Sequence, residues 1–173
     1  MLPLQKNYNI TSNEIADLLK THYPNLLQAF YESQSSFLCG IYKRYKSIET
    51  ANIVLCFARS VHLEIIRQRE KDLNFNVSLN NFWENFNGIN RPNLKITTIV
   101  KITGIPKETV RRKINELSKK KILRISNING ILLGNEYKKI FSKFVPETTL
   151  QVSKLLKGWE KSGILKSLLD FKI

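Results

Sequence analysis

The sequence has few of the residues that build metal centres and disulfide frameworks. Its 173 residues include two cysteines and two histidines. Cys39 and Cys56 are not spaced as a metal-binding pair, which favours two free, partly buried thiols, with a redox-sensing pair as the alternative. His22 and His62 also lack ligand spacing, so we interpret both as satisfied, partly exposed side chains rather than as sensor or ligand residues. We therefore expect no metal ion.

Patterns of catalysis and of membrane insertion are missing as well. The seven glycines form no phosphate-binding loop, and serine, histidine and aspartate are too scattered to indicate a catalytic triad. No run of eighteen uncharged apolar residues is present, and the first stretch, MLPLQKNYNITSNE, lacks the apolar core of a signal peptide. We expect a cytoplasmic protein that is not an enzyme, uses no cofactor and does not span a membrane.

Acidic residues are scarce in one part of the chain. The net charge is +14. Residues 1–90 hold nine basic and eight acidic side chains, whereas residues 91–124 hold eleven basic and only two acidic ones. Lysine-rich coding bias would spread the excess evenly, so this concentration indicates a local cause. A surface of one sign favours a polyanion, either nucleic acid or an anionic membrane.

Helical patterns fill the first ninety residues. A capping-box pattern begins at Thr11, Pro24 begins a second apolar pattern, and Ser47 can cap a third helix. Ser78 and Gly88 bound a short fourth helix. The apolar stripe of the third helix is Ile53, Val54, Phe57, Val61 and Ile65.

The centre of the chain has a different order. Two short helical patterns, Ile96–Thr103 and Pro106–Lys120, are separated only by Gly104 and Ile105. The following ILRISNINGILLG, rich in β-branched residues around a turn signal, predicts a hairpin. Further helices are expected after it, one of them beginning at Pro146. The predicted order is helix, tight turn, helix, hairpin.

The second of these central helices has two distinct faces. At 100° per residue, Ile114 and Leu117 lie within about 40° of Val110, and the three predict a buried face. The opposite side carries Glu108, Arg112, Asn115 and Lys119, with Arg111 on the flank. The major groove of DNA admits a helix, and these side-chain types read base edges or hold phosphates.

The segment ITTIVKITGIPKETVRRKINELSKKKIL and the hairpin after it resemble the winged helix-turn-helix domain of bacterial transcription regulators. The resemblance covers roughly residues 78–134 and is strongest from Thr103 to Lys113. It implies that Ile96–Thr103 is a positioning helix, that Pro106–Lys120 is the recognition helix, and that Leu123–Leu133 is the wing. The expected fold class is mainly α with a small β-hairpin wing, flanked by N-terminal and C-terminal helices.

The resemblance and the two-faced helix together give the candidate DNA-binding residues. They are Lys107, Glu108, Thr109, Arg111, Arg112, Asn115, Lys119, Arg124, Asn127 and Asn129. Wings of the family often carry a basic residue at the tip, whereas here the tip is uncharged and the nearest cation is at its base. Sugar or phosphate contact through the two tip asparagines is then expected in place of minor-groove insertion.

The remaining helices need a partner surface. We expect residues 1–77 and 135–173 to flank the domain and to contribute to a homodimer, as symmetric regulators are commonly two-fold dimers. The alternative is a monomer whose apolar stripes form an intrachain core. The predicted function is sequence-specific binding of double-stranded DNA to regulate transcription. Its rivals are a winged-helix module that binds a protein or RNA partner, and a peripheral membrane protein held by basic helices.

Overall fold

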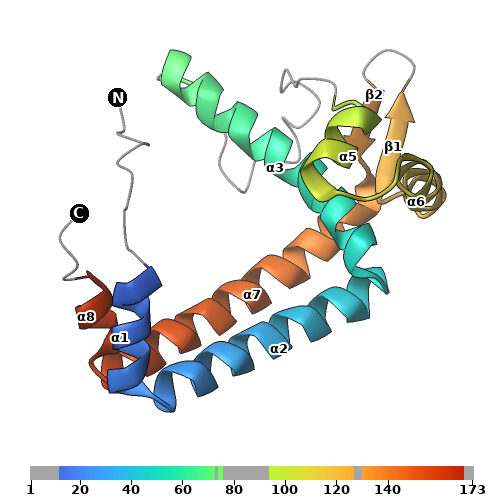
Figure 1. Cartoon of the computed structure of the whole chain (residues 1–173). Coiled ribbons are helices and arrows are strands. Elements are labelled where there is room, and N and C mark those ends of the chain that lie inside the picture. Colours follow the sequence, from blue (N-terminus) through green and yellow to red (C-terminus); the bar gives the residue numbers. More distant parts are fainter. Residues whose placement is uncertain (1–11, 73, 76–93, 127–129, 170–173) are drawn as a thin grey trace. The chain divides into compact units, whose positions relative to one another are not determined.

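The computed structural model describes residues 12–72, 74–75, 94–126 and 130–169 (Figure 1). These residues form seven helices and one two-stranded antiparallel hairpin, which confirms the prediction of a mainly helical chain with a small hairpin. The predicted helix between Ser78 and Gly88, the cap at Thr11 and the hairpin tip at 127–129 lie outside the described residues. The predicted boundary between residues 77 and 78 lies outside them too.

The chain forms two compact units. The terminal unit combines Met1–Gly40 with Phe144–Ile173, and the central unit is Ile41–Lys143. Helices α2 (Asn25–Tyr45) and α7 (Asn135–Lys161) each run from one unit into the other. Within the described residues, every helix is too short or too polar to cross a lipid bilayer.

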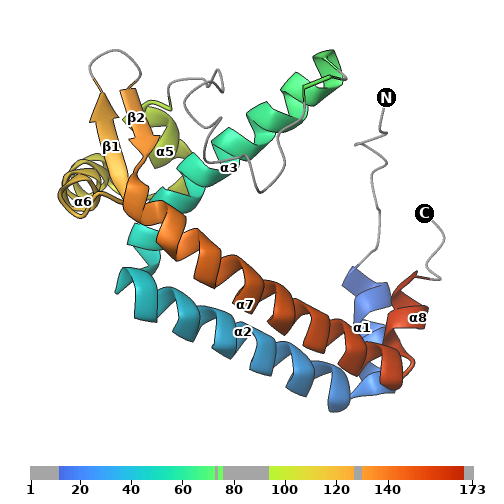
Figure 2. The ribbon, with the colours of Figure 1, turned by 180° about the vertical axis from the view of Figure 1, so that it is seen from behind.

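The terminal unit is built from two long helix segments and two short helices. Helix α1 is Ser12–His22 and helix α8 is Ile164–Leu169. Within this unit the segments of α2 and α7 lie side by side in both views (Figures 1 and 2). The rings of Phe37 and Phe144 join them, with centroids 5.9 Å apart. Few apolar side chains here are buried; Ile164, with no exposed surface, is the exception in the part of the unit that the structure describes.

The central unit begins with the helix that the sequence predicts after Ser47. Helix α3 spans Ile48–Lys71, and the Ser47 hydroxyl oxygen accepts a hydrogen bond of 3.1 Å from the backbone N–H of Thr50. This satisfies one of the amides that a helix leaves without a partner at its first turn. The predicted N-cap is therefore confirmed.

Two helices and the hairpin of the central unit pack against α3. Helix α5 is Ile96–Thr103, helix α6 is Lys107–Lys119, and the hairpin strands are β1, Leu123–Ser126, and β2, Gly130–Leu133. Both predicted helices and the hairpin thus occur where the sequence indicates them. Leu123 pairs with Leu133 and Arg124 with Leu132 across the two strands. Helix α3 contacts α5, α6 and β2.

The predicted stripe of α3 is the centre of this core. Each of its five residues has 7% or less of its surface exposed: Ile53, Val54, Phe57, Val61 and Ile65. Burial of one such side chain contributes about 1.5–3 kcal/mol. Because the central unit itself covers this stripe, these five residues belong to an intrachain core.

One predicted break does not occur. Pro146 does not begin a helix; it lies inside α7, which continues from Asn135 to Lys161. Proline has no N–H to donate to the carbonyl four residues earlier, at Ser142. Both Pro146 and Ser142 are exposed, so water can satisfy that carbonyl, and the helical turns on either side continue. The prediction of a new helix at Pro146 was wrong.

Candidate nucleic-acid interface

The turn between α5 and α6 is built by four consecutive residues. Gly104 has φ of 70°, a left-handed conformation that suits glycine. The Thr103 hydroxyl donates to the carbonyl of Ile99 at 2.7 Å, and its oxygen lies 3.3 Å from the amide of Ile105. Ile105 has 7% of its surface exposed and anchors the turn in the core. Pro106 follows at the N-cap position of α6.

Helix α6 holds itself in the core by one face. Val110, Ile114 and Leu117 are at most 2% exposed, which confirms the buried face predicted from their spacing. These three residues fix the rotation of the helix about its axis. Every residue that lies opposite them on the helix must therefore face away from the core.

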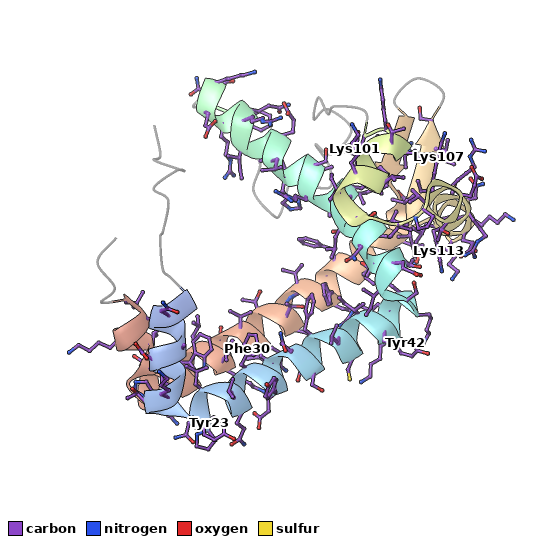
Figure 3. The ribbon with its side chains drawn as sticks, viewed as in Figure 1. Tyr23, Phe30, Tyr42, Lys101, Lys107 and Lys113 are labelled. Atoms are coloured by element: carbon purple, nitrogen blue, oxygen red, sulfur yellow. The ribbon has the colours of Figure 1, made fainter. Side chains whose placement is uncertain are left out.

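The structure brings most of the predicted site residues to that exposed side of α6. Lys107, Glu108, Arg111, Arg112, Asn115 and Lys119 are exposed, and Thr109 is half-buried. Arg124 is exposed on β1. Asn127 and Asn129 lie outside the described residues. Figure 3 labels Lys107 and Lys113 on α6 and Lys101 on α5, the helix that packs against it.

Two glutamates on α6 lie close to its arginines. Arg112 Nη1 donates to Glu116 Oε1 at 2.8 Å, and Arg111 Nη1 lies 3.8 Å from Glu108 Oε2. The side chains of both arginines are more than half exposed. Exposed pairs of this spacing stabilise a helix by about 0.3–0.5 kcal/mol each. An anionic ligand can therefore displace either carboxylate at little cost.

The end of α6 adds cations that the sequence analysis did not single out. Lys120 and Lys121 are exposed beside Lys119, and Lys101 is exposed on α5. Lys121 has φ of 56°. Its amide donates to the carbonyl of Ser118 at 2.9 Å, and the amide of Ile122 donates to that of Leu117 at 3.0 Å. This pair of bonds is the Schellman termination of a helix, with lysine at the position that usually holds glycine.

Lys113 behaves differently from the other basic residues of α6. Only 15% of its side chain is exposed, and its Nζ lies 3.9 Å from Glu116 Oε2. It lies between the buried and the exposed faces. The run of lysines and arginines in the sequence therefore separates into an exposed group and one cation held against the helix surface.

The described residues contain no group of three or more histidine, cysteine, aspartate or glutamate side chains that could hold a metal ion. The exposed side of α6 instead offers guanidinium, ammonium and amide donors, which suit phosphate oxygens and base edges. In comparisons with known proteins, no protein family, curated protein or solved structure matches this chain.

Proposed function

We propose that the protein is a transcription regulator that binds a specific sequence of double-stranded DNA through a winged helix-turn-helix in the central unit. In this proposal α5 is the positioning helix, α6 the recognition helix and the β1–β2 hairpin the wing. One observation carries it: α6 buries Val110, Ile114 and Leu117 while Arg111, Arg112 and Asn115 stand exposed on its other side.

The proposal distinguishes contacts to bases from contacts to phosphates. Arg112 and Asn115, near the middle of the exposed side of α6, would reach base edges, where arginine prefers guanine and asparagine prefers adenine. Lys119 and Arg124, at the end of α6 and on β1, would neutralise phosphates and release counterions. The phosphate contacts set orientation and the base contacts set sequence preference.

Site selection from random duplex DNA, followed by salt titration on the selected site, tests the function. We expect an enriched sequence and a log–log slope of affinity against salt of about −4 to −8, as several phosphates are contacted. Absence of enrichment together with a flat salt response would exclude the proposal. Tighter binding to duplex RNA, or binding only to anionic vesicles, would favour the RNA-binding or the membrane-surface alternative.

We also propose a homodimer, held by the terminal unit. Its support is the apolar surface that this unit leaves uncovered: Phe30, Leu38, Val152 and Leu156 are 38–48% exposed. The stripe of α3 is not available for this purpose because the central unit covers it. One winged helix reads only a few base pairs, and a two-fold pair doubles that readout.

Sedimentation equilibrium with and without DNA tests the dimer. We expect a dimer that binds a pseudo-palindromic site with half-sites about one helical turn apart. The variant Leu38→Asp, on the uncovered surface, should shift the protein toward monomer while leaving the preferred half-site unchanged. A monomeric wild-type protein that binds asymmetric DNA one to one would contradict the dimer and leave DNA binding intact.

A further inference from the structure

A cavity of about 870 Å³ lies in the central unit, between α3 and the two ends of α5. Most of its α3 residues recur every three or four positions, so they share one helix face, opposite the buried stripe. Leu55 and Leu63 supply apolar surface from α3, Leu94 supplies it from the chain just before α5, and Ile102 supplies it from the last turn of α5. Cavities of about 300–1,000 Å³ with mostly apolar walls are typical of sites for small organic molecules.

The charged side chains that line the cavity are both basic. Arg59 and Arg67 line it, and none of its described lining residues is acidic. Arg59 has no carboxylate within 4 Å among the described residues. Arg67 lies 3.8 Å from Glu64, and 62% of its side chain is exposed. Arg59 is therefore available to an anion, and the long, exposed pair of Arg67 with Glu64 is weak enough for an anion to displace the carboxylate.

The cavity is also lined by a cysteine thiol whose pKa responds to the charge of Arg59. Cys56 is half-buried and lines the cavity. Burial raises the pKa of the Cys56 thiol, and the positive charge of Arg59 offsets part of that rise.

We infer that this cavity binds a small amphipathic organic anion, with its carboxylate at Arg59 and Arg67 and its apolar body against Leu55, Leu63 and Ile102. The apolar walls require an alkyl or aryl body, and the two guanidinium groups select a negative head group. A neutral alcohol of equal length lacks the ion pair, and a quaternary amine is repelled.

The cavity is joined directly to the proposed recognition helix. Ile102 and Thr103 belong to the last turn of α5, and the oxygen of Thr103 lies 3.3 Å from the amide of Ile105. Ile105 is the buried residue immediately before α6 begins. A ligand against Ile102 and Thr103 therefore bears on the turn that positions α6. The ligand also neutralises cations, so we infer that it lowers the affinity for DNA; this second half rests on the proposed function.

Alkylation of the two cysteines tests binding without DNA. Decanoate is the probe, with decanol and decyltrimethylammonium as neutral and cationic controls. Iodoacetamide labelling is followed by mass spectrometry at fixed pH. Decanoate should slow the labelling of Cys56 and leave Cys39 unchanged, because Cys39 is exposed in the terminal unit and serves as an internal control. Equal labelling rates with and without decanoate would overturn the site, whatever the protein does with DNA.

Charge variants separate the cavity from the general positive charge of the protein. Arg59→Gln and Arg67→Gln should each lower the affinity for decanoate about fivefold, the effect of losing one partly exposed ion pair. Lys154→Gln removes the same charge from an exposed position of α7 in the terminal unit and should have no effect. Equal losses in all three variants would mean diffuse attraction, and the site would be abandoned.

DNA binding with and without decanoate tests the regulatory half. We expect the affinity for the selected duplex to fall at least about fivefold in wild type, the lower end of typical coupling between sites, and much less in Arg59→Gln. By reciprocity, DNA should weaken decanoate binding by the same factor. Protection of Cys56 without any change in DNA affinity would keep the site and refute its regulatory role. Failure to bind DNA at all would refute the proposed function and leave the cysteine result to decide the site.

Discussion

Gly134 packs directly against the main chain of Lys121. A Cβ atom at position 134 would overlap the carbonyl oxygen of Lys121 and lie 2.8 Å from its carbonyl carbon. The amide of Gly134 donates to the carbonyl of Ile122 at 2.7 Å, and the amide of Glu136 donates to that of Lys121 at 3.1 Å. The end of the hairpin is thereby fastened to the end of α6, and only a residue without a side chain fits.

The first prediction follows from that contact. Gly134→Ala should destabilise the central unit by about 3 kcal/mol, because neither backbone segment can move without breaking the hydrogen bonds between them. Gly104→Ala is the matched comparison. Gly104 has φ of 70°, but no atom lies within 4 Å of where its Cβ would be. Gly104→Ala should therefore cost only about 1–2 kcal/mol of strain. Urea denaturation measures both, and an equal or smaller loss for Gly134→Ala would contradict the close approach.

The second prediction separates stability from binding at Lys121. Its φ of 56° is costly for lysine, so Lys121→Gly should stabilise the fold by about 0.5–1 kcal/mol. Lys46, with φ of 59° after α2, is the matched control, and Lys46→Gly should stabilise similarly. Only Lys121→Gly should weaken DNA binding and reduce the salt slope by about one. A loss of DNA affinity in both variants would contradict the assignment of Lys121 as a DNA contact.

The third prediction separates base contacts from phosphate contacts on α6. Arg112→Ala should cost about 1–3 kcal/mol on the selected site and relax its sequence preference, since a base contact is lost. Lys119→Ala should weaken all sequences alike and shallow the salt slope. Identical behaviour of the two variants in competition binding would mean that the wrong face of α6 has been turned toward DNA. Val110→Asp is the structural control and should unfold the unit by burying an unpaired charge.

The fourth prediction concerns the carboxylate that holds Arg112. Glu116→Gln removes a negative charge from the exposed side of α6 and releases Arg112 from its 2.8 Å pair, so DNA affinity should rise about twofold. Glu136→Gln is the control. Glu136 pairs with Lys139 at 2.7 Å, and its side chain is 40% exposed against 44% for Glu116. Fluorescence anisotropy at low salt measures both, and a rise shared by the two variants would point to net charge alone.

The fifth prediction concerns alkaline pH. Burial raises the pKa of Tyr45 to about 12, although the charge of nearby Arg44 opposes the rise, and burial raises that of Tyr137 as well. In the unfolded chain tyrosine titrates near pH 10, so the folded state holds these protons more tightly. Their contribution to stability is complete below pH 10 and is lost as the pH rises toward 12.

Urea denaturation between pH 9 and 12 checks this. The free energy of unfolding should fall by about 2–3 kcal/mol through the titration of Tyr45. Tyr45→Phe should make the decline with pH shallower because it removes one of the titrating groups. Tyr42→Phe, at a position that is 63% exposed, is the control and should leave the slope as in wild type. An unchanged slope in Tyr45→Phe would show that its burial does not control the titration.

Local patterns predicted the described helices α3, α5 and α6 and the hairpin of the central unit well. The period of Val110, Ile114 and Leu117, together with Gly104 and Pro106, gave the bounds of α6 within one residue and its buried face. These signals depend on neighbouring residues alone, which the sequence displays directly. The cap at Ser47 was predictable for the same reason.

The features that sequence patterns missed depend on distant parts of the chain or on a local rule that packing overrides. Proline usually ends a helix. Helix α7 continues through Pro146 because the carbonyl of Ser142, which loses its backbone partner, is exposed to water. Lys121 holds a left-handed position that a pattern search assigns to glycine or asparagine. The cavity beside Arg59 is lined by residues of α3 and by residues at and just before α5, which are distant in the sequence, so no single segment reveals it.

The packing of α3 also has a consequence for synthesis on the ribosome. Its buried stripe is covered by α5, α6 and β2, and roughly 60 residues separate the end of α3 from β2. At about 5–20 residues per second, those residues take roughly 3–12 s to be made. During that time the five apolar side chains of the α3 stripe are exposed, because the elements that cover them have not yet been made. The nascent chain is therefore expected to bind holding chaperones through α3, and to release them once β2 has emerged.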